Sequence, residues 1–301
     1  MLKYCLLSIV IKMSRNWFSK VLVVITILAL VVIFSKSYTA ETDNTANLKV
    51  WFINVGQGDS ELIDTPTDQH ILIDGGPDES IVTKVNSILG SNDNYIDLVV
   101  LSHYHSDHLT GLNEILAHYN VGEIWTSGAI YDSATYRKFV ELAKSKNIKV
   151  TNVIAASYRD FGQVHGTVLA PIASYEGKNI TDAHEAMVVT EWQYGTQKIL
   201  FTGDMESDLE QSLINRGSLS KVDILKVGHH GSSTSSSQNF LNLVKPTFAV
   251  IEVGKDNKYG HPTDSTVQKL KAIGATILRT DQVGTIKFSL DGTNISYQTG
   301  Q

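Results

Sequence analysis

The chain has a single cysteine among its 301 residues, Cys5, and it lies within the first forty. The remainder of the chain can therefore form no disulfide within itself and offers no thiolate ligand. Any metal site beyond the first forty residues must use histidine and carboxylate side chains.

Acidic residues are absent from the first forty positions, which contain five Lys or Arg residues and an apolar run over 21–34 that only Thr26 interrupts. A basic segment followed by a short apolar run is typical of a signal peptide. The run falls short of the roughly 20 residues that cross a bilayer comfortably, which favours a signal peptide over a permanent anchor. We expect residues 1–40 to be a signal peptide or membrane anchor that contacts the membrane, with the rest of the chain facing outward.

Positive charge is scarce after residue 40, where 20 Lys and Arg residues face 31 Asp and Glu residues, a net charge of about −11. Lys and Arg side chains supply most of the nonspecific affinity of proteins for nucleic acids. This charge balance argues against a tight nonspecific grip on a polyanion.

The polar segment 41–47 is predicted to be a linker, and residues 48–301 to be the folded domain. Periodicity predicts strands at 50–55, 61–64, 70–73, 98–101, 187–192, 198–201, 223–227, 248–253, 276–278 and 285–290, and helices at 80–89, 206–215, 236–243 and 263–273. Hairpins early in each half, with helices later, indicate an α+β fold in which two mixed sheets pack face to face with helices outside.

The apolar run 98–101 is followed by three imidazoles and a carboxylate within six positions, namely His103, His105, Asp107 and His108. On an extended strand end, residues two apart share a face, so His103 and His105 can close on one ion. Asp107 and His108, after the chain turns, would face a neighbouring position. This ligand set suits zinc, and manganese or iron are alternatives. A polar loop rich in histidine by chance is the other interpretation, which the four-residue pattern argues against.

Two aspartates also follow apolar strands. Asp74 precedes Gly75 and Gly76, which allow a sharp turn, although an ordinary strand-ending turn is an equal alternative. Asp204 follows the strand 198–201, where we expect it at a sheet edge rather than buried. Its carboxylate could bridge two ions, cap the following helix, or both.

Four later histidines lie near strand ends: His184 before 187–192, His229 and His230 after 223–227, and His261 beyond 248–253. With the first cluster, they place seven of the ten histidines at such positions. His184 would complete three imidazoles on the first ion. Its neighbours Asp182 and Glu185 are alternative ligands.

The His103-x-His105-x-Asp107-His108 motif, with Asp74 before it and Asp204 after it, resembles the metallo-β-lactamase fold hydrolases from residue 48 to the end. More narrowly, four segments resemble the C-terminal hydrolase domain of the competence DNA-uptake channel ComEC. They are NVGQGDS at 54–60, LFTGD at 200–204, HHGS at 229–232 and NKYGHP at 257–262. The resemblance implies a four-layered αββα sandwich with a two-metal site in the groove between the sheet edges.

Carried onto this sequence, the family pattern implies that His103, His105 and a residue near His184 bind the first ion. Asp107, His108 and the bridging Asp204 would bind the second. The pattern also implies that a later histidine completes the second site or contacts a substrate phosphate, the candidates being His229, His230 and His261. The competence domain commonly has Asn and Ser where this chain has His184 and Glu185, which leaves the first-site set and the substrate open.

Two divalent ions, zinc or manganese, would lower the pKa of a bridging water molecule and supply hydroxide at neutral pH. Asp107 or Asp204 would orient it, and His230 or His261 would donate a hydrogen bond to the developing charge or protonate the leaving group. The expected function is an exported hydrolase of phosphodiester bonds, acting on DNA or on a small cell-envelope phosphoester.

Other functions stay open. One is a metal-binding module without catalysis, and another is a hydrolase of a different ester or a lactam. With one short apolar segment, the chain is not expected to be a transport channel, and no protein partner is predicted.

Overall fold

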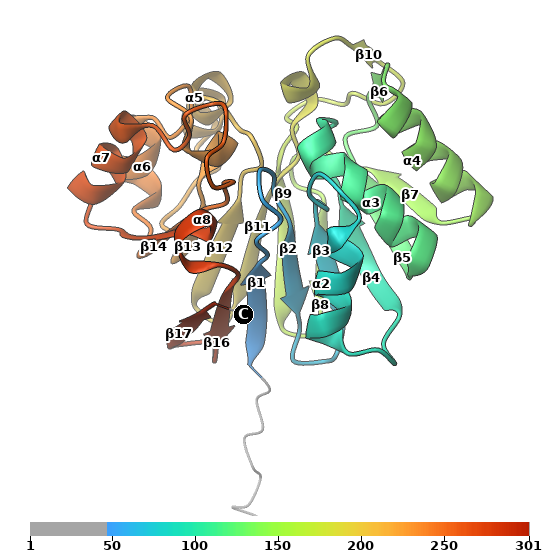
Figure 1. Cartoon of the computed structure of the whole chain (residues 1–301). Helices are drawn as coiled ribbons and strands as arrows, with labels where there is room; N and C mark the ends of the chain where they lie inside the picture. The colour runs from blue at the N-terminus through green and yellow to red at the C-terminus, as the bar shows by residue number, and fades with distance from the viewer. Residues whose placement is uncertain (1–46, 301) are drawn as a thin grey trace, which may run out of the picture. The chain divides into compact units, whose positions relative to one another are not determined.

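The computed structural model describes residues 47–300, in which two β-sheets form the centre (Figure 1). The predicted signal or anchor segment lies outside the described residues, as does the linker up to residue 46. Within residues 47–300, no helix combines the length and hydropathy needed to cross a bilayer.

The first sheet has eight strands in the order β17-β16-β1-β2-β3-β4-β5-β7. They are β1 (Leu48–Phe52), β2 (Glu61–Asp64), β3 (His70–Ile73), β4 (Tyr95–Val100), β5 (Asn120–Thr126), β7 (Lys149–Asn152), β16 (Ile286–Leu290) and β17 (Ile295–Thr299). The strands from β17 to β3 are antiparallel to their neighbours, whereas β3, β4, β5 and β7 are parallel. The predicted bounds of β2 and β3 are confirmed.

The second sheet has seven strands in the order β15-β14-β13-β12-β11-β9-β8. They are β8 (Tyr158–Phe161), β9 (Val164–Ala170), β11 (Val189–Tyr194), β12 (Gln197–Phe201), β13 (Ile224–Lys226), β14 (Phe248–Ile251) and β15 (Thr276–Arg279). This sheet is antiparallel from β8 to β12 and parallel from β12 to β15. Two short strands, β6 (Ile130–Tyr131) and β10 (Asn179–Ile180), pair separately.

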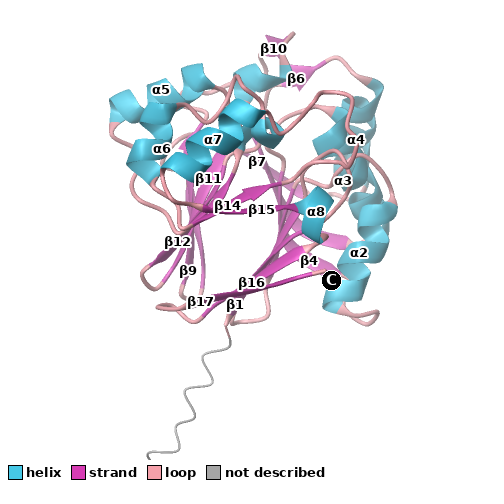
Figure 2. Cartoon of the chain, turned by 60° about the vertical axis from the view of Figure 1, so that its left-hand side comes forward, coloured by secondary structure: helices cyan, strands magenta, loops and turns pink. Residues whose placement is uncertain are grey.

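Helices lie on the outer side of each sheet (Figures 1 and 2). Those beside the first sheet are α2 (Ser80–Leu89), α3 (Ser106–His118) and α4 (Ala134–Ser145), and those beside the second are α5 (Ser207–Arg216), α6 (Gln238–Val244) and α7 (Asp264–Ala272). The chain also forms α8 (Thr280–Val283) and the 3-10 helices η1 (Ala183–Ala186) and η2 (Gly228–Gly231).

Three layers of buried apolar side chains hold these elements together. Phe52, Trp192 and Phe288 belong to the layer between the sheets. Leu112 packs between the first sheet and its helices, and Leu213 does the same on the second sheet. Apolar burial of this kind contributes about 25 cal/mol per Å². The predicted αββα sandwich is confirmed.

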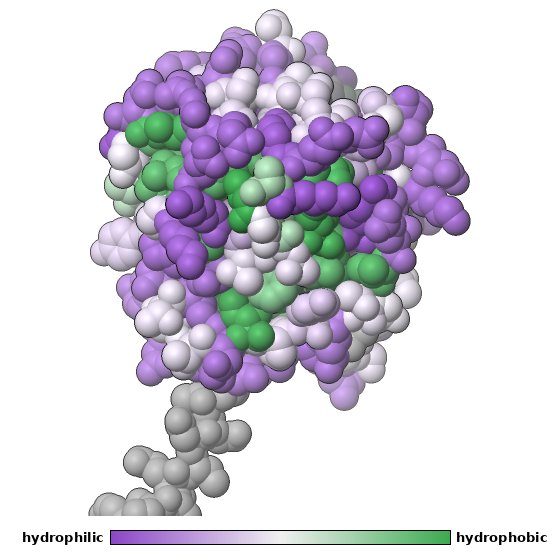
Figure 3. All heavy atoms as spheres, turned by 90° about the vertical axis from the view of Figure 1, so that its left-hand side faces the viewer, coloured by the Kyte–Doolittle hydropathy of each residue, from purple (hydrophilic) through white to green (hydrophobic). Residues whose placement is uncertain are grey.

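The outer face on the side of α6 and α7 is mostly hydrophilic, with hydrophobic side chains in smaller groups among the polar ones (Figure 3). α7 has this pattern in its own residues, because Leu270 is buried while Lys271 is exposed. The helices of the second half therefore direct one face to the core and one to solvent.

The elements between residues 102 and 186 were missed by the sequence reading, and α3 matters most among them. β4 ends at Val100, so His103 and His105 do not lie on a strand end as expected. His105 is the N-cap of α3, and Asp107 and His108 occupy its first turn. The motif is therefore a loop that enters a helix, and this turn brings its side chains together.

Helix α3 lies against the turn that follows β3. The amide of Gly75 donates to the carbonyl of His108 at 2.8 Å, and the amide of Gly111 donates to that of Gly76 at 3.0 Å. A Cβ atom at Gly111 would lie 1.8 Å from the carbonyl oxygen of Gly75. Only glycine allows this approach, which places Asp74 beside the histidine motif.

Replacing Gly111 with alanine should therefore destabilise the protein by about 1–3 kcal/mol through overpacking. In an unconstrained helix the same change stabilises by roughly 0.5–1 kcal/mol. Urea unfolding would measure the difference, with the neighbouring Thr110→Ala as control, expected to change stability by less than about 0.5 kcal/mol. A Gly111→Ala protein as stable as the parent would contradict this packing.

Candidate metal centre

The candidate ligands come from loops and helix starts that follow strands of both sheets. The motif enters α3 after β4, Asp204 follows β12, and His230 lies in η2 after β13. His184 comes from η1, which precedes β11. Residues distant in the sequence therefore meet where the two sheets face each other.

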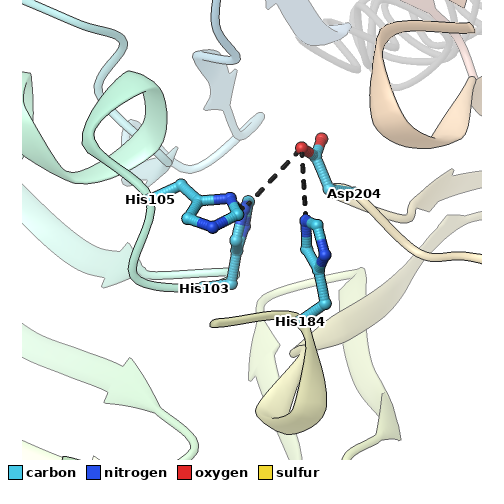
Figure 4. Close-up of side chains that lie close together, drawn as sticks. All are labelled: His103, His105, His184 and Asp204. Atoms are coloured by element: carbon cyan, nitrogen blue, oxygen red, sulfur yellow. Dashed lines mark hydrogen bonds and ion pairs between the residues drawn. The ribbon is translucent and has the colours of Figure 1, made fainter. Parts of the chain in front are cut away.

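The first group consists of His103, His105, His184 and Asp204, each of which offers one ligand atom within 4.8 Å of the others (Figure 4). Nε2 of His103 lies 3.1 Å from Nδ1 of His105. Oδ2 of Asp204 lies 3.7 Å from Nε2 of His103 and 3.8 Å from Nε2 of His184. Three imidazoles and one carboxylate oxygen thus point at one position, a set that suits zinc.

The second group is formed by His108, His230 and the other oxygen of Asp204, and Asp107 lies beside it. Oδ1 of Asp204 lies 3.4 Å from Nε2 of His108 and 3.6 Å from Nε2 of His230. Nε2 of His230 also lies 3.4 Å from Oδ2 of Asp107. Asp204 thus directs one oxygen to each group, the arrangement of a bridging carboxylate.

Asp204 is buried, with 2% of its surface exposed, so the expectation of a carboxylate at an open sheet edge was wrong. The turn after β12 directs its side chain inward between the histidines. It is not a helix cap either, because the N-cap of α5 is Glu206. Burial alone would raise the pKa of Asp204, but the charges of His230 and His108 hold it well below its usual range.

The alternative ligands beside His184 have other partners. The carboxylate of Asp182 accepts from the amide of His184 at 2.9 Å, and Oε1 of Glu185 accepts from the amide of Asp182 at 3.3 Å. Together they form a capping box for η1. This cap leaves the His184 imidazole to face the first group.

Unpaired buried atoms indicate that the site fits a cation. Among residues 47–300, the buried atoms without a hydrogen-bond partner include four from the ligand residues of this site: Nε2 of His108, His184 and His230, and Oδ1 of Asp204. Buried polar atoms without partners are rare because each costs about 1–3 kcal/mol. All four face the two groups, and divalent ions would satisfy them.

The pKa shifts of the site histidines also indicate that the site fits a cation. Burial, and then the charge of His108, hold the pKa of His103 well below its ordinary value, so this imidazole is neutral and can bind metal. For His108 the effect of burial is outweighed by Asp204 and Asp59, which raise its pKa well above the ordinary value. The buried carboxylates therefore favour a positive charge beside them. Without metal ions, a proton on His108 supplies that charge.

Asp74 holds the histidines of the motif in place. Its Oδ2 lies 2.8 Å from Nδ1 of His108, and its Oδ1 accepts from the amide of Ser102 at 2.8 Å. The hydroxyl of Ser102 in turn lies 3.0 Å from Nδ1 of His103. A carboxylate on the far nitrogen of a ligand histidine fixes its tautomer and ring orientation.

His229 and His261 line a pocket of 240 Å³ in front of the two groups. His229 was predicted among the metal ligands, but it lies outside the converging sets, although its Nε2 is 3.7 Å from Oδ2 of Asp204. Its Nδ1 lies 3.2 Å from Oε1 of Glu206. Tyr259, which is 56% exposed, stacks on His261 at the pocket wall.

Sequence reasoning assigned no role to four buried ionisable residues next to the second group, although one of them lies in the NVGQGDS segment. They are Asp59, Glu61, Lys226 and Glu252. Lys226 ends the apolar strand β13, and Glu252 directly follows the apolar strand β14. An ionisable residue beside an otherwise apolar strand was the signal available.

Comparison with known proteins gives a family. The sequence profile of the Metallo-beta-lactamase superfamily matches residues 53–254. Competence protein ComA of Neisseria gonorrhoeae is 34% identical over 87% of this chain and 35% of its own length. ComE operon protein 3 of Bacillus subtilis (strain 168) is 26% identical over 80% of this chain and 33% of its own length. The chain thus spans about a third of each of these relatives.

Solved structures support the fold alone. CmlA beta-hydroxylase, as its E377D mutant, has a TM-score of 0.55 at 11% identity and covers 81% of this chain and 54% of its own. The metallo-beta-lactamase fold protein YhfI from Bacillus subtilis has a TM-score of 0.50 at 15% identity, covering 77% and 95%. The profile match shows that this chain belongs to the metallo-β-lactamase superfamily, whose members are generally metal-dependent hydrolases, and the two relatives show that it resembles a part of competence proteins.

Proposed function

We propose that the protein is a two-metal hydrolase of phosphodiester bonds. The observation that carries the proposal is that the two oxygens of Asp204 face different histidines beside one pocket, Oδ2 facing His103 and His184 and Oδ1 facing His108 and His230. Two divalent ions there would activate a water molecule and neutralise charge on the attacked ester. His103, His105 and His184 would hold one ion, and zinc and manganese are the candidates for both sites.

Asp107 is placed to orient the attacking water. It lies at the pocket wall and beside the second group, 3.4 Å from His230. Burial alone would raise the pKa of Asp107, but the neighbouring His230 and the charge of His108 lower it to about 2. Its carboxylate is therefore ionised at neutral pH and can accept a hydrogen bond from the water molecule.

His261 is placed to act on the substrate rather than on an ion. Burial, and then the charges of His229 and His230, lower the pKa of His261, so it is neutral at pH 7. A neutral imidazole can donate its N–H to a phosphate or leaving-group oxygen. His230 does not fit that role, because it is buried and its Nε2 faces the second group.

The similarity to competence proteins favours a phosphodiester over a lactam. We propose DNA or a smaller cell-envelope phosphoester as substrate. The acidic charge balance after residue 40 disfavours tight binding of long DNA. We also propose that residues 1–40 direct the domain outside the cytoplasm, which protease accessibility of whole cells would test.

Purified protein loaded with Mn²⁺ or Zn²⁺ would be assayed on single-stranded DNA, on bis-p-nitrophenyl phosphate and on a β-lactam. We expect hydrolysis of the phosphodiesters and no turnover of the lactam. His105→Ala should remove activity, whereas His118→Ala, at the exposed end of α3, should leave it unchanged.

The outcomes separate the alternatives. Cleavage of the small ester alone would exclude the nuclease. Bound ions without hydrolysis of any ester would favour a non-catalytic module and contradict the proposal.

A further inference from the structure

A buried charged cluster lies behind the second group. It consists of Asp59, Glu61, Lys226 and Glu252, whose exposed fractions are 0%, 1%, 0% and 1%. Glu61 begins β2 of the first sheet, whereas Lys226 ends β13 of the second sheet and Glu252 directly follows β14. Burying ions costs several kcal/mol each, so a fold that places four ionisable groups here needs strong compensating contacts.

The contacts of the cluster lead to one metal-facing imidazole. Nζ of Lys226 lies 2.5 Å from Oδ2 of Asp59, and Oδ1 of Asp59 lies 3.2 Å from Nδ1 of His230. The same Nδ1 donates to the backbone carbonyl of Glu252 at 2.9 Å. With its proton held on Nδ1, His230 directs the lone pair of Nε2 to the second group.

Asp59 and Lys226 form the closest ion pair of the cluster. Burial, and then repulsion from neighbouring carboxylates, raise the pKa values of Glu61 and Glu252, which favours their neutral forms. Burial alone would raise the pKa of Asp59, but Lys226 and then His230 hold it below its ordinary value. Asp59 is therefore the carboxylate of the cluster that lies between Lys226 and His230.

His230 depends on such partners because its backbone is strained. Its φ is 52°, in the left-handed region that costs a non-glycine residue roughly 1–2 kcal/mol. The first group has other supports: Ser102 contacts His103, and His184 lies on a capped 3-10 helix. His108, in the second group, is held mainly by Asp74, since Oδ2 of Asp59 lies farther away, at 3.8 Å.

We propose that Asp59 and Lys226 are positioning residues for the second ion only. Lys226 holds Asp59, Asp59 holds His230, and the first group does not depend on them. The inference rests on the proposed two-ion centre and predicts the order in which the ions are lost. A chain without the Asp59 and Lys226 pair keeps the first ion and loses the second.

Metal content after equilibrium dialysis against Mn²⁺ or Zn²⁺ tests this. The parent protein should hold two ions, whereas Lys226→Met and Asp59→Asn should hold one, with affinity for the second reduced about 10–100-fold. In a His105→Ala background, which weakens the first site, Asp59→Asn should remove the remaining ion as well.

The matched control is Glu210→Gln, a change at another buried acid of the second half, whose carboxylate accepts from the amides of Ser236 and Ser237. The Glu210→Gln protein should be less stable and still hold both ions. This result would show that loss of the second ion in the other variants is not a consequence of lower stability alone. Asp59→Asn keeps the side-chain shape, so it serves if Lys226→Met does not fold.

Two results would overturn the inference: variants that keep both ions at parental affinity, or variants that lose both ions in parallel. A parent protein that binds fewer than two ions would overturn the two-ion centre and the inference together. Two bound ions without phosphodiester cleavage would contradict the proposed function alone, and the order of loss would still decide the inference.

Discussion

Replacing Asp204 with asparagine should lower phosphodiester turnover by a factor on the order of 10³. Asp204 contributes one oxygen to each group, so the change removes a negative charge from both ion sites at once. Metal ions supply several kcal/mol of transition-state stabilisation, and each 1.36 kcal/mol is tenfold in rate. The measurement is kcat on bis-p-nitrophenyl phosphate, together with the metal content of the purified variant.

Asp208→Asn is the matched control, because Asp208 is exposed on α5 four positions away and belongs to neither group. It should keep both ions and full turnover. An Asp204→Asn protein with two tightly bound ions and parental activity would show that Asp204 does not bridge.

The sequence predicts the fold well where apolar periodicity and turns agree. β2, β3 and α2 have the predicted bounds because each is a short apolar or amphipathic segment between polar turns. α3 was missed although Leu109, Leu112 and Leu116 follow helical spacing. The reason is that its first turn contains part of the polar histidine motif, which shows no apolar periodicity.

The sequence names most residues of the candidate site but not their geometry. Compact motifs locate His103, His105 and Asp107, because metal ligands on adjacent chain positions leave a local pattern. The roles of His229 and His230 could not be separated by sequence, since they are neighbours of the same type. The left-handed backbone at both residues sends one ring to the pocket wall and buries the other.

The Asp59 and Lys226 pair illustrates what a single sequence leaves out. The two residues are far apart in the chain and belong to different halves of the fold. Only the packing of β13 near the loop after β1 brings them to 2.5 Å. From the sequence alone, Lys226 is an isolated charged residue in an apolar strand, and nothing in the sequence indicates that Asp59 is its partner.

Removing the ions with EDTA should abolish hydrolysis and make the protein less stable at pH 9 than at pH 6. Burial alone would lower the pKa of His230, but Asp204 and Asp59 raise it from 6.5 to about 10 in the ion-free protein. A raised pKa favours the folded state fully below pH 6.5, and this contribution is lost as the pH rises towards 10. Thermal unfolding at the two pH values measures the effect.

With Mn²⁺ or Zn²⁺ added, the protein should instead be more stable at pH 9 than at pH 6. The ions compete with the proton on the His230 imidazole and bind more tightly as the pH rises. His230→Asn should reduce the pH dependence of stability in the EDTA-treated protein, since it removes one of the histidines whose pKa is raised, and His108 remains. At the acid end, Asp107 gives the opposite sign: its pKa of about 2 stabilises the fold above pH 3.8, and this is lost as the pH falls towards 2. Stability of the ion-free protein should therefore be greatest between about pH 4 and 6.5, and a maximum near pH 9 would mean that the carboxylates around His230 do not hold its proton.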